Sequence, residues 1–413
     1  MPGPGMEIIG KEEIEEVMDV LKSQWLYRYG EVKDPNFKQK VIKFEKAVCE
    51  LSNVPYGVAV NSGTTALLVA LGAVGVGPGD EVIVPGYTYI ASISSIVYSR
   101  AIPVLAEVDQ TFNLDPADVE AKITPRTKAI IAVHMMGNPA RLDELRSIAD
   151  NHGLILVEDC AQAFGASYKG QPIGSIGDIA IFSFNVYKTI TAGDGGMVIT
   201  SNENYYKRSF AFHDQGHSPN RTGVEVGNRP FIGLSFRMTE LQGAALLGQI
   251  KKLPHILNHL RDNKTRFKNM IADLQDIEFR VLPDPDGEIC TILTILLPTP
   301  DVAKRVAEEL GGKPLSAAGW HVYNNMENIL EQSTITPEKC PFTCPYYTEK
   351  GGHMEYRKGM LPQTDSLLNR TINISIGVAD PGIGASFGVT MNDELDVVEQ
   401  RAEEFLRIAK KHL

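Results

Sequence analysis

Short apolar runs alternate with longer amphipathic stretches along the first 250 residues of the chain. Runs rich in Val and Ile, such as 56–60, 81–85 and 129–133, are separated by segments with apolar positions at helical spacing. Strands that alternate with helices in this way favour a mostly parallel sheet covered on both faces. The pattern therefore predicts an α/β fold.

The pattern changes after this region, and we expect a large domain over 1–250 followed by a smaller α+β domain over 251–413. Residues 237–274 have apolar positions at helical spacing that are interrupted at Pro254, which predicts two helices joined by a break. The other predicted elements are strands within 279–298 around a turn at 284–287, and capped helices at 301–312 and 392–413.

The composition is typical of a globular protein that acts on small molecules. The 413 residues are 43% hydrophobic and 22% charged, with a net charge of −11. Nucleic-acid binding through a broad basic surface is disfavoured, because neutralising phosphates requires clustered Lys and Arg. The N-terminus does not resemble a signal peptide, and the apolar stretch from Ala66 is too short to span a bilayer. We therefore expect a cytoplasmic enzyme with no membrane partner.

The five cysteines do not suggest a disulfide framework, because their number is odd and they are spread thinly. Cys340 and Cys344 lie four residues apart, but no second pair nearby completes a zinc site. A structural role is favoured for both, and we expect no metal.

Polar clusters follow two of the predicted strands, at the edge where open parallel sheets bind ligands. In the first cluster, Ser62, Gly63 and Thr64 begin a helix and could bind phosphate through backbone N–H groups. An ordinary Ser/Thr N-cap is the alternative. In the second, an apolar strand runs into Glu158 and Asp159, and a buried carboxylate is costly without a partner.

A third cluster places Ser183 and Lys188 around another predicted strand end. On its own Lys188 could be a solvated loop lysine. The three clusters together, however, match what pyridoxal 5'-phosphate requires: a lysine amine for its aldehyde, an aspartate for its ring nitrogen and donors for its phosphate. We therefore predict a pyridoxal-phosphate enzyme.

The chain resembles the sugar aminotransferases of the DegT/DnrJ type, a branch of the fold-type I pyridoxal-phosphate enzymes. The resemblance covers essentially the whole chain. It implies a large, mostly parallel sheet domain with helices on both faces and a smaller C-terminal α+β domain. The motifs that carry it, in the family's order, are "NSGTTAL", "DEVIVPGYTYIAS", "VHMMGNPARLDEL", "LVEDCAQAFGASYKG", "IGDIAIFSFNVYKTITAGDGGMVIT" and "GLSFRMTELQGAALL".

This resemblance implies cofactor-binding roles for several residues. Lys188 would bind the cofactor covalently, Asp159 would pair with the pyridine nitrogen, and Gln162 would hydrogen-bond the ring 3'-oxygen. Tyr89 would stack on the ring face, a role that suits a flat aromatic side chain. The phosphate would be held by Gly63, Thr64 and Ser183.

The family is dimeric with sites at the subunit interface, so the resemblance also implies a homodimer. A loop residue that is commonly Asn reaches the neighbour's phosphate, whereas this chain has Ser235. Serine can still donate one hydrogen bond, with a shorter reach. Asp194 stands where the family more often has Glu, a change that preserves the charge.

The implied reaction is a ping-pong transfer of an amino group from glutamate or glutamine to a keto or aldehyde sugar. Lys188 would act as both general base and general acid. A lysine at this position also argues against the related pyridoxamine-dependent sugar dehydratases, which have His there. Two alternatives remain open, a pyridoxal-phosphate lyase or dehydratase that consumes no amino donor, and a non-catalytic regulator that binds the cofactor or an amino sugar.

The sugar acceptor is indicated by weaker features. Segments near Trp25, from Phe212 and from Asp365 are similar to the branch that aminates C8 of a 3-deoxy-octulosonate with glutamate. A nucleotide-linked keto sugar or a cyclitol is the alternative acceptor. The glycine-rich stretch from Gly382 is predicted to be a flexible connection rather than a phosphate site.

Five polar residues are candidates for contacts with the substrate. Arg28 and Arg370 could pair with a substrate carboxylate, for which the guanidinium fork is well suited, and a surface or packing role is the alternative. His213, His217 and His321 could line the sugar pocket, although a lone loop histidine is more often structural or solvated.

Overall fold

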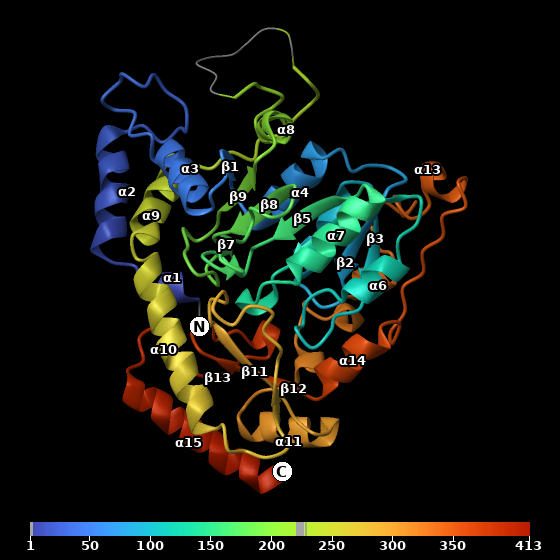
Figure 1. The fold of residues 1–413 in the computed structure, drawn as a ribbon. Helices are drawn as coiled ribbons and strands as arrows, with labels where there is room; N and C mark the ends of the chain where they lie inside the picture. Colours follow the sequence, from blue (N-terminus) through green and yellow to red (C-terminus); the bar gives the residue numbers. More distant parts are fainter. Residues whose placement is uncertain (1–2, 220–226, 228) are drawn as a thin grey trace.

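The computed structural model describes residues 3–219, 227 and 229–413, and its largest element is a seven-stranded sheet (Figure 1). Its strands are β1 (Tyr56–Val60), β2 (Glu81–Pro85), β3 (Ile102–Ala106), β4 (Thr127–Val133), β5 (Ile155–Asp159), β8 (Ile179–Ser183) and β9 (Gly196–Thr200). They lie in the order β1-β9-β8-β5-β4-β2-β3. All neighbours are parallel except β9, which runs antiparallel to both β1 and β8. The predicted mostly parallel sheet is confirmed.

Helices cover both faces of this sheet. Successive residues of a strand point to opposite faces, so Ile83 of β2 belongs to one hydrophobic core and its neighbour Val82 to the other. The first core includes residues of α3 (Lys40–Leu51) and α7 (Leu142–His152), and the second includes residues of α4 (Gly63–Ala73) and α5 (Ile90–Tyr98). This double covering explains why the strands read as near-continuous apolar runs.

A second sheet has the strand order β10-β11-β12-β13. Its strands are β10 (Glu278–Phe279), β11 (Ile292–Leu296), β12 (Thr371–Ser375) and β13 (Phe387–Gly388), and only the β12–β13 pair is parallel. The helices α11 (Pro300–Glu309) and α15 (Leu395–His412) lie beside this sheet (Figure 1). The strands on both sides of the predicted turn at 284–287 are therefore present.

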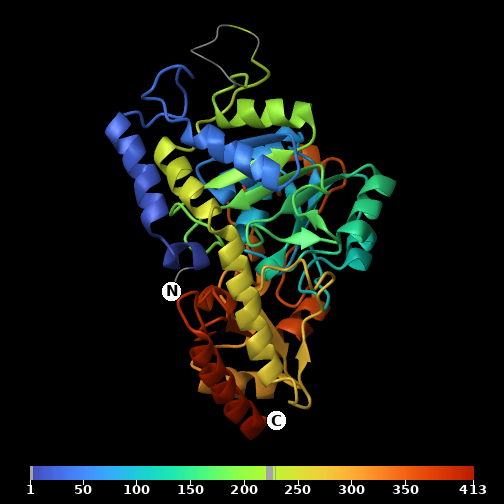
Figure 2. The same ribbon diagram turned by 60° about the vertical axis from the view of Figure 1, so that its left-hand side comes forward.

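Two helices connect the sheets, α9 (Glu240–Ile250) and α10 (Leu253–Met270). Pro254 lies in the first turn of α10, where its missing N–H costs no hydrogen bond, so the predicted break is confirmed. Figure 2 shows α10, in yellow, running from the larger sheet to the smaller one. Of the two helices predicted to be capped, α11 has a Thr299 cap on Val302 N–H, whereas α15 has no side-chain cap.

One segment from the C-terminal part packs on the larger sheet. It contains α12 (Glu327–Leu330), α13 (Pro345–Thr348) and α14 (Pro362–Asn369). The hydroxyl of Tyr356 donates to the carbonyl of Pro103 at 2.6 Å, and that of Tyr347 donates to Glu81 at 3.2 Å. The division at residue 250 stays a prediction, since this segment lies against the sheet of the other proposed domain.

Further helices and short strands complete the fold. They are α1 (Pro4–Glu7), α2 (Lys11–Ser23), α6 (Pro116–Ala121), β6 (Ser167–Tyr168), β7 (Gln171–Pro172) and α8 (Glu203–His213). In the described part of the chain, no helix combines the length and the apolar character needed to cross a bilayer.

Candidate active site

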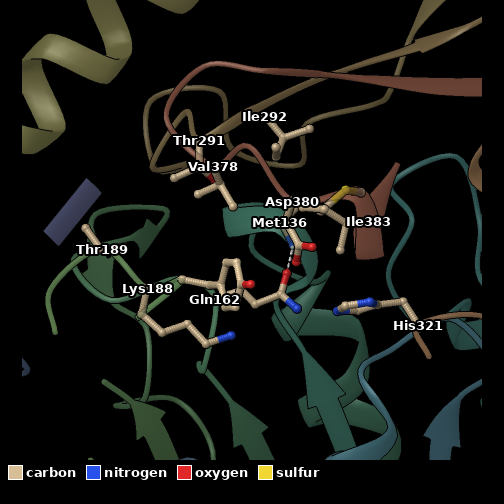
Figure 3. Close-up of a pocket in the computed structure, with 11 residues that line it drawn as sticks. Met136, Gln162, Lys188, Thr189, Thr291, Ile292, His321, Val378, Asp380 and Ile383 are labelled. Atoms are coloured by element: carbon tan, nitrogen blue, oxygen red, sulfur yellow. Dashed lines mark hydrogen bonds between the residues drawn. The ribbon is translucent and has the colours of Figure 1, made fainter. Parts of the chain in front are cut away.

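A cavity of about 590 Å³ opens at the carboxyl ends of β4, β5 and β8. These strands end at Val133, Asp159 and Ser183, which all line the cavity. This is the edge at which open α/β sheets bind ligands. Figure 3 shows an adjoining smaller pocket, which shares with the cavity Gln162, Tyr187, Lys188, His321 and Asp380.

Lys188 lies on the loop between β8 and β9 and extends along the pocket (Figure 3). Its backbone N–H donates to the carbonyl of Asn185 at 2.9 Å, which fixes the turn that presents it. Burial lowers the pKa of Lys188, and the carboxylates of Asp159 and Asp380 oppose that shift. A lower pKa increases the fraction of neutral amine, which is the nucleophilic form.

Asp159 ends β5 with its carboxylate in the cavity lining and a side chain that is almost fully buried. Its Oδ2 accepts a hydrogen bond from the Ser92 hydroxyl at 2.7 Å, and its Oδ1 accepts one from Ala161 N–H at 3.1 Å. Burial raises the pKa of Asp159, whereas these two hydrogen bonds lower it. A carboxylate held in this way favours a cationic ligand group in the cavity.

The helix α4 begins at the cavity, and its start has both the N-cap and the unbonded backbone N–H groups that the sequence suggested. Ser62 Oγ accepts a hydrogen bond from Thr65 N–H at 3.2 Å, so Ser62 is the N-cap. Within the described residues, no group accepts a hydrogen bond from the N–H of Gly63 or Thr64, and both residues line the cavity. An N-cap and a free pair of donors for an anion therefore coexist at this helix terminus.

Gly63 is held in a close contact that leaves no room for a side chain. A Cβ at this position would lie 2.6 Å from Ser183 Cβ and 2.8 Å from Ser183 Oγ. We expect Gly63→Ala to separate α4 from β8 and to raise the dissociation constant of pyridoxal phosphate at least about 10-fold, or ~1.4 kcal/mol. Titration of the cofactor-free protein measures this change. Gly77→Ala, at a glycine with open space around it, is the matched control. If both variants bound pyridoxal phosphate with equal affinity, the proposed role of Gly63 in the phosphate site would be contradicted.

Gln162 and Tyr89 line the same cavity as Asp159 and Lys188. Gln162 Oε1 accepts a hydrogen bond from Met136 N–H at 2.9 Å, and this bond leaves the Nε2 amide facing the pocket (Figure 3). Tyr89 lines the cavity and is 44% exposed as a residue, so its aromatic ring is available for stacking.

Asp194 and Ser235 differ in their placement. Asp194 lines the cavity, and its Oδ1 accepts a hydrogen bond from Asn185 Nδ2 at 3.0 Å. Ser235 does not line the cavity of its own chain and forms an isolated β-bridge with Asp214. Its contact with a neighbouring subunit stays a prediction.

Arg28, which was predicted to pair with a substrate carboxylate, is turned into the protein core. It is 2% exposed, and its guanidinium donates to Glu45 at 2.8 Å and to the carbonyl of Ala59 at 3.0 Å. His213 lies beside it with Nε2 at 3.2 Å from Arg28 Nη1, and neither lines the cavity. Internal partners engage both side chains, and the substrate contact of Arg28 and His213 stays a prediction.

Two other candidates also lie away from the cavity. His217 is buried and is not among the lining residues. Arg370 pairs with Glu278 at 3.0 Å, on the smaller sheet. Their predicted substrate contacts are not brought to the cavity of the same chain and stay predictions. Residues 220–223 of the loop that begins at Phe212 lie outside the described residues.

His213 should make the stability of the folded protein depend on pH. Burial and the charge of Arg28 lower the pKa of His213 to about 3. Because an unfolded histidine takes up a proton near pH 6.5 and the folded one does not, the free energy of unfolding falls as pH drops from 6.5 towards 3. Between pH 7 and pH 5 this term amounts to about 2 kcal/mol. Urea unfolding at pH 7 and pH 5 measures this difference in the free energy of unfolding. We expect His213→Gln to remove the His213 part of the difference, and the exposed control His152→Gln to keep it.

His321 is the one predicted histidine that lines the cavity. Its ring lies 5.2 Å from that of Tyr89, and its Nδ1 donates to the carbonyl of Gly382 at 2.8 Å. Gly382 also lines the cavity, and the stretch that it begins contains a 3-10 turn and β13. This stretch therefore contributes Gly382 to the cavity wall, and its interpretation as a flexible connection stays a prediction.

Sequence reasoning also missed three residues of the site. Ser92 reaches Asp159 from α5, Asn185 reaches Asp194, and Asp380 lies opposite Lys188 in the pocket. A serine one helical turn after Tyr89 offered a weak signal for the first. No local pattern distinguishes the other two from ordinary turn residues.

Three buried side chains next to the site, those of His134, Glu158 and Cys160, lie close enough together to bind a metal ion in principle. His134 Nδ1 accepts a hydrogen bond from Ala140 N–H at 3.0 Å, so its Nε2 carries the proton and donates to Glu158 at 3.2 Å. Glu158 also accepts from the N–H groups of Gly174, Ile176 and Gly177. This group therefore anchors the end of β5 beside Asp159.

The chain is similar to several known proteins. GDP-perosamine synthase from Caulobacter vibrioides is 42% identical over 238 residues, 57% of this chain and 61% of that protein. The L-glutamine:2-deoxy-scyllo-inosose aminotransferase of Streptoalloteichus tenebrarius is 40% identical over 240 residues, 56% of each chain. The match thus spans less than two thirds of the length of both relatives.

The structure of S. venezuelae DesV in complex with a ketimine intermediate aligns with a TM-score of 0.74 at 27% identity, over 97% of this chain and 94% of that one. The pattern that defines the DegT/DnrJ/EryC1/StrS aminotransferase family matches residues 7–379. These residues include the seven-stranded sheet and nearly all of the cavity lining. The chain therefore belongs to the DegT/DnrJ/EryC1/StrS aminotransferase family and has the fold of the fold-type I pyridoxal-phosphate enzymes.

Proposed function

We propose that the protein is a pyridoxal-phosphate aminotransferase that moves an amino group from glutamate or glutamine to a carbonyl sugar. The observation that carries the proposal is a single cavity that brings together three groups: the Lys188 amine, the buried Asp159 carboxylate and the free N–H groups at the start of α4. Each matches a different part of the cofactor.

The residues present fit the cofactor well. Asp159 has no arginine or lysine hydrogen-bonded to it among the described residues, so a protonated ring nitrogen would supply the missing cation. Gly63, Thr64 and Ser183 would hold the phosphate, Gln162 the ring 3'-oxygen and Tyr89 the ring face. When bound, the cofactor supplies an electron sink that stabilises negative charge on the substrate carbon next to nitrogen.

Lys188 has two tasks in this proposal. Its Nζ would bind the cofactor, and once an amino acid has displaced it, the same amine would take the proton from the donor's α-carbon. Its lowered pKa suits this task, because a general base must be unprotonated near neutral pH. The charges of Asp159 and Asp380 limit how far the pKa of Lys188 falls, so the amine can also carry a proton and return it.

The charge balance of the cavity supports a homodimer. Lys188 is the only lysine or arginine among the described lining residues, which also include Asp159, Asp194 and Asp380. A phosphate and the carboxylates of a donor amino acid need more positive charge than this lining provides. We propose that a second copy of the chain completes the site. Sedimentation should give a dimer, and a monomer that retains full activity would contradict this part of the proposal.

For the acceptor, we propose a keto or aldehyde sugar, with C8 of a 3-deoxy-octulosonate as the first compound to test. The sequence resemblance around Trp25 and Asp365 supports that choice. The names of the two relatives instead point to a nucleotide-linked sugar and a cyclitol as alternatives. Arg28 does not line the cavity, which removes one of the reasons for expecting a sugar carboxylate.

The two half-reactions can be tested separately. Glutamate or glutamine added to the cofactor-loaded protein should abolish the visible absorption band and release the matching 2-oxoacid. A panel of carbonyl sugars added to the resulting aminated form should restore the band only with a true acceptor. A lyase or dehydratase would form product without 2-oxoacid, and a regulator would leave the band unchanged, so either result would contradict the proposal.

A further inference from the structure

We propose that Asp380 and His321 form a subsite that offers only hydrogen-bond acceptors and binds hydroxyl groups of the sugar acceptor next to Lys188. This inference rests on the proposed function and specifies which chemical groups of the acceptor are recognised. Both side chains line the cavity and the adjoining pocket (Figure 3).

One peptide unit orients the two side chains. Gly382 N–H donates to Asp380 Oδ1 at 2.7 Å, while the Gly382 carbonyl accepts from His321 Nδ1 at 2.8 Å. Both groups are therefore tied to the same short 3-10 turn, Pro381–Ile383. These two hydrogen bonds leave Asp380 Oδ2 and His321 Nε2 without a partner among the described residues.

The hydrogen-bonding state of His321 follows from its partner. A carbonyl can only accept, so Nδ1 must carry the hydrogen, and in a neutral imidazole Nε2 is then an acceptor. Burial and the nearby charge of Lys188 lower the pKa of His321 to about 4, which keeps the ring neutral at physiological pH. No described residue hydrogen-bonds to His321 Nε2.

The backbone around His321 fixes the ring beside the predicted cofactor plane. Thr88 N–H donates to the carbonyl of His321 at 2.9 Å, and Ile90 N–H donates to that of Trp320 at 3.0 Å. Tyr89, which is predicted to cover the cofactor ring, lies between these two donors. The acceptor pair is therefore held beside Tyr89 in the wall of the cavity.

A pair of side chains that can only accept hydrogen bonds favours ligand groups that donate them. Sugar hydroxyls can donate to an anionic oxygen and to an imidazole nitrogen, whereas a carboxylate or phosphate placed there would be repelled by Asp380. The family match ends at residue 379, so Asp380 and Gly382 lie beyond it. His321 lies within the matched residues, so the pair combines one residue of the family pattern with one beyond it.

The test compares two three-carbon aldehydes that differ only in hydroxyl groups, D-glyceraldehyde and propionaldehyde. With the aminated protein, we expect the ratio of their kcat/KM values to fall at least about 10-fold in Asp380→Asn. Asparagine can still accept the Gly382 hydrogen bond but presents an amide donor in place of an anionic oxygen. Asp396→Asn, an exposed carboxylate in the first turn of α15, makes the same charge change and should keep the wild-type ratio.

A second readout does not depend on turnover. In protein labelled with ¹⁵N at histidine, the Nε2 resonance of His321 should shift when D-glyceraldehyde is added and stay in place with propionaldehyde. An unchanged ratio in Asp380→Asn together with an unmoved resonance would overturn the subsite. Failure of glutamate and glutamine to convert the wild-type protein would instead overturn the proposed function, and the resonance would still test the subsite.

Discussion

Replacing Lys188 by alanine is expected to lower amino transfer at least about 10³-fold, since general acid–base catalysis by one side chain alone contributes about 10²–10⁴-fold. The variant loses both the covalent attachment point and the proton carrier. Lys188 is held by a backbone hydrogen bond to Asn185 rather than by its side chain, so the loop should keep its structure. Stopped-flow measurement of the first half-reaction gives the rate directly.

The control for this experiment is Lys207→Ala. Lys207 forms an exposed pair with Glu203 on α8, and such pairs contribute little to stability or function. It should behave as wild type. If Lys188→Ala still completed turnovers at the wild-type rate while remaining folded, the assignment of the active site would be wrong.

Replacing Asp159 by asparagine is expected to slow the first half-reaction by about 10²–10³-fold, the usual cost of removing one preorganised electrostatic group. Asparagine is nearly the same size, and its one amide oxygen can still accept from Ala161 N–H, while the Ser92 hydroxyl can turn to accept from the amide NH2 group. What is lost is the negative charge that would keep the ring nitrogen protonated. The pKa of that nitrogen in the bound cofactor, measured by ¹⁵N NMR, should therefore fall.

An independent measurement separates this effect from unfolding. The midpoint of thermal unfolding of Asp159→Asn without cofactor should be at least that of wild type, because removing a buried charge relieves its desolvation. A slow variant with an unchanged ring-nitrogen pKa would show that Asp159 does not face that nitrogen.

The features that could be predicted from sequence are those encoded locally. The apolar strands that end at Asp159 and Ser183 identified the ligand-binding edge, because parallel strands place their carboxyl ends together. Pro254 likewise marked the start of α10, because proline at a first helical turn follows a local rule. Lys188, Gly63 and Gln162 are contributed by loops and a helix start that adjoin these strands.

The features that could not be predicted depend on long-range packing. Arg28 was expected at the substrate because arginine suits carboxylates, but its partners Glu45 and Ala59 become apparent only once α3 and β1 pack together. Asp380 reaches the pocket from the loop between β12 and β13 of the smaller sheet. Nothing in the sequence around "ADPGIG" indicates that Lys188 lies across from it.

The most direct test of the account is to locate the cofactor on the chain. Borohydride reduction of the cofactor-loaded protein turns a carbon–nitrogen double bond into a stable single bond, and mass spectrometry of the digested protein then identifies the modified residue. The account predicts pyridoxal phosphate on Lys188 in the peptide that contains "NVYKTITAGDGG". Modification of a different lysine, or of none, would contradict it.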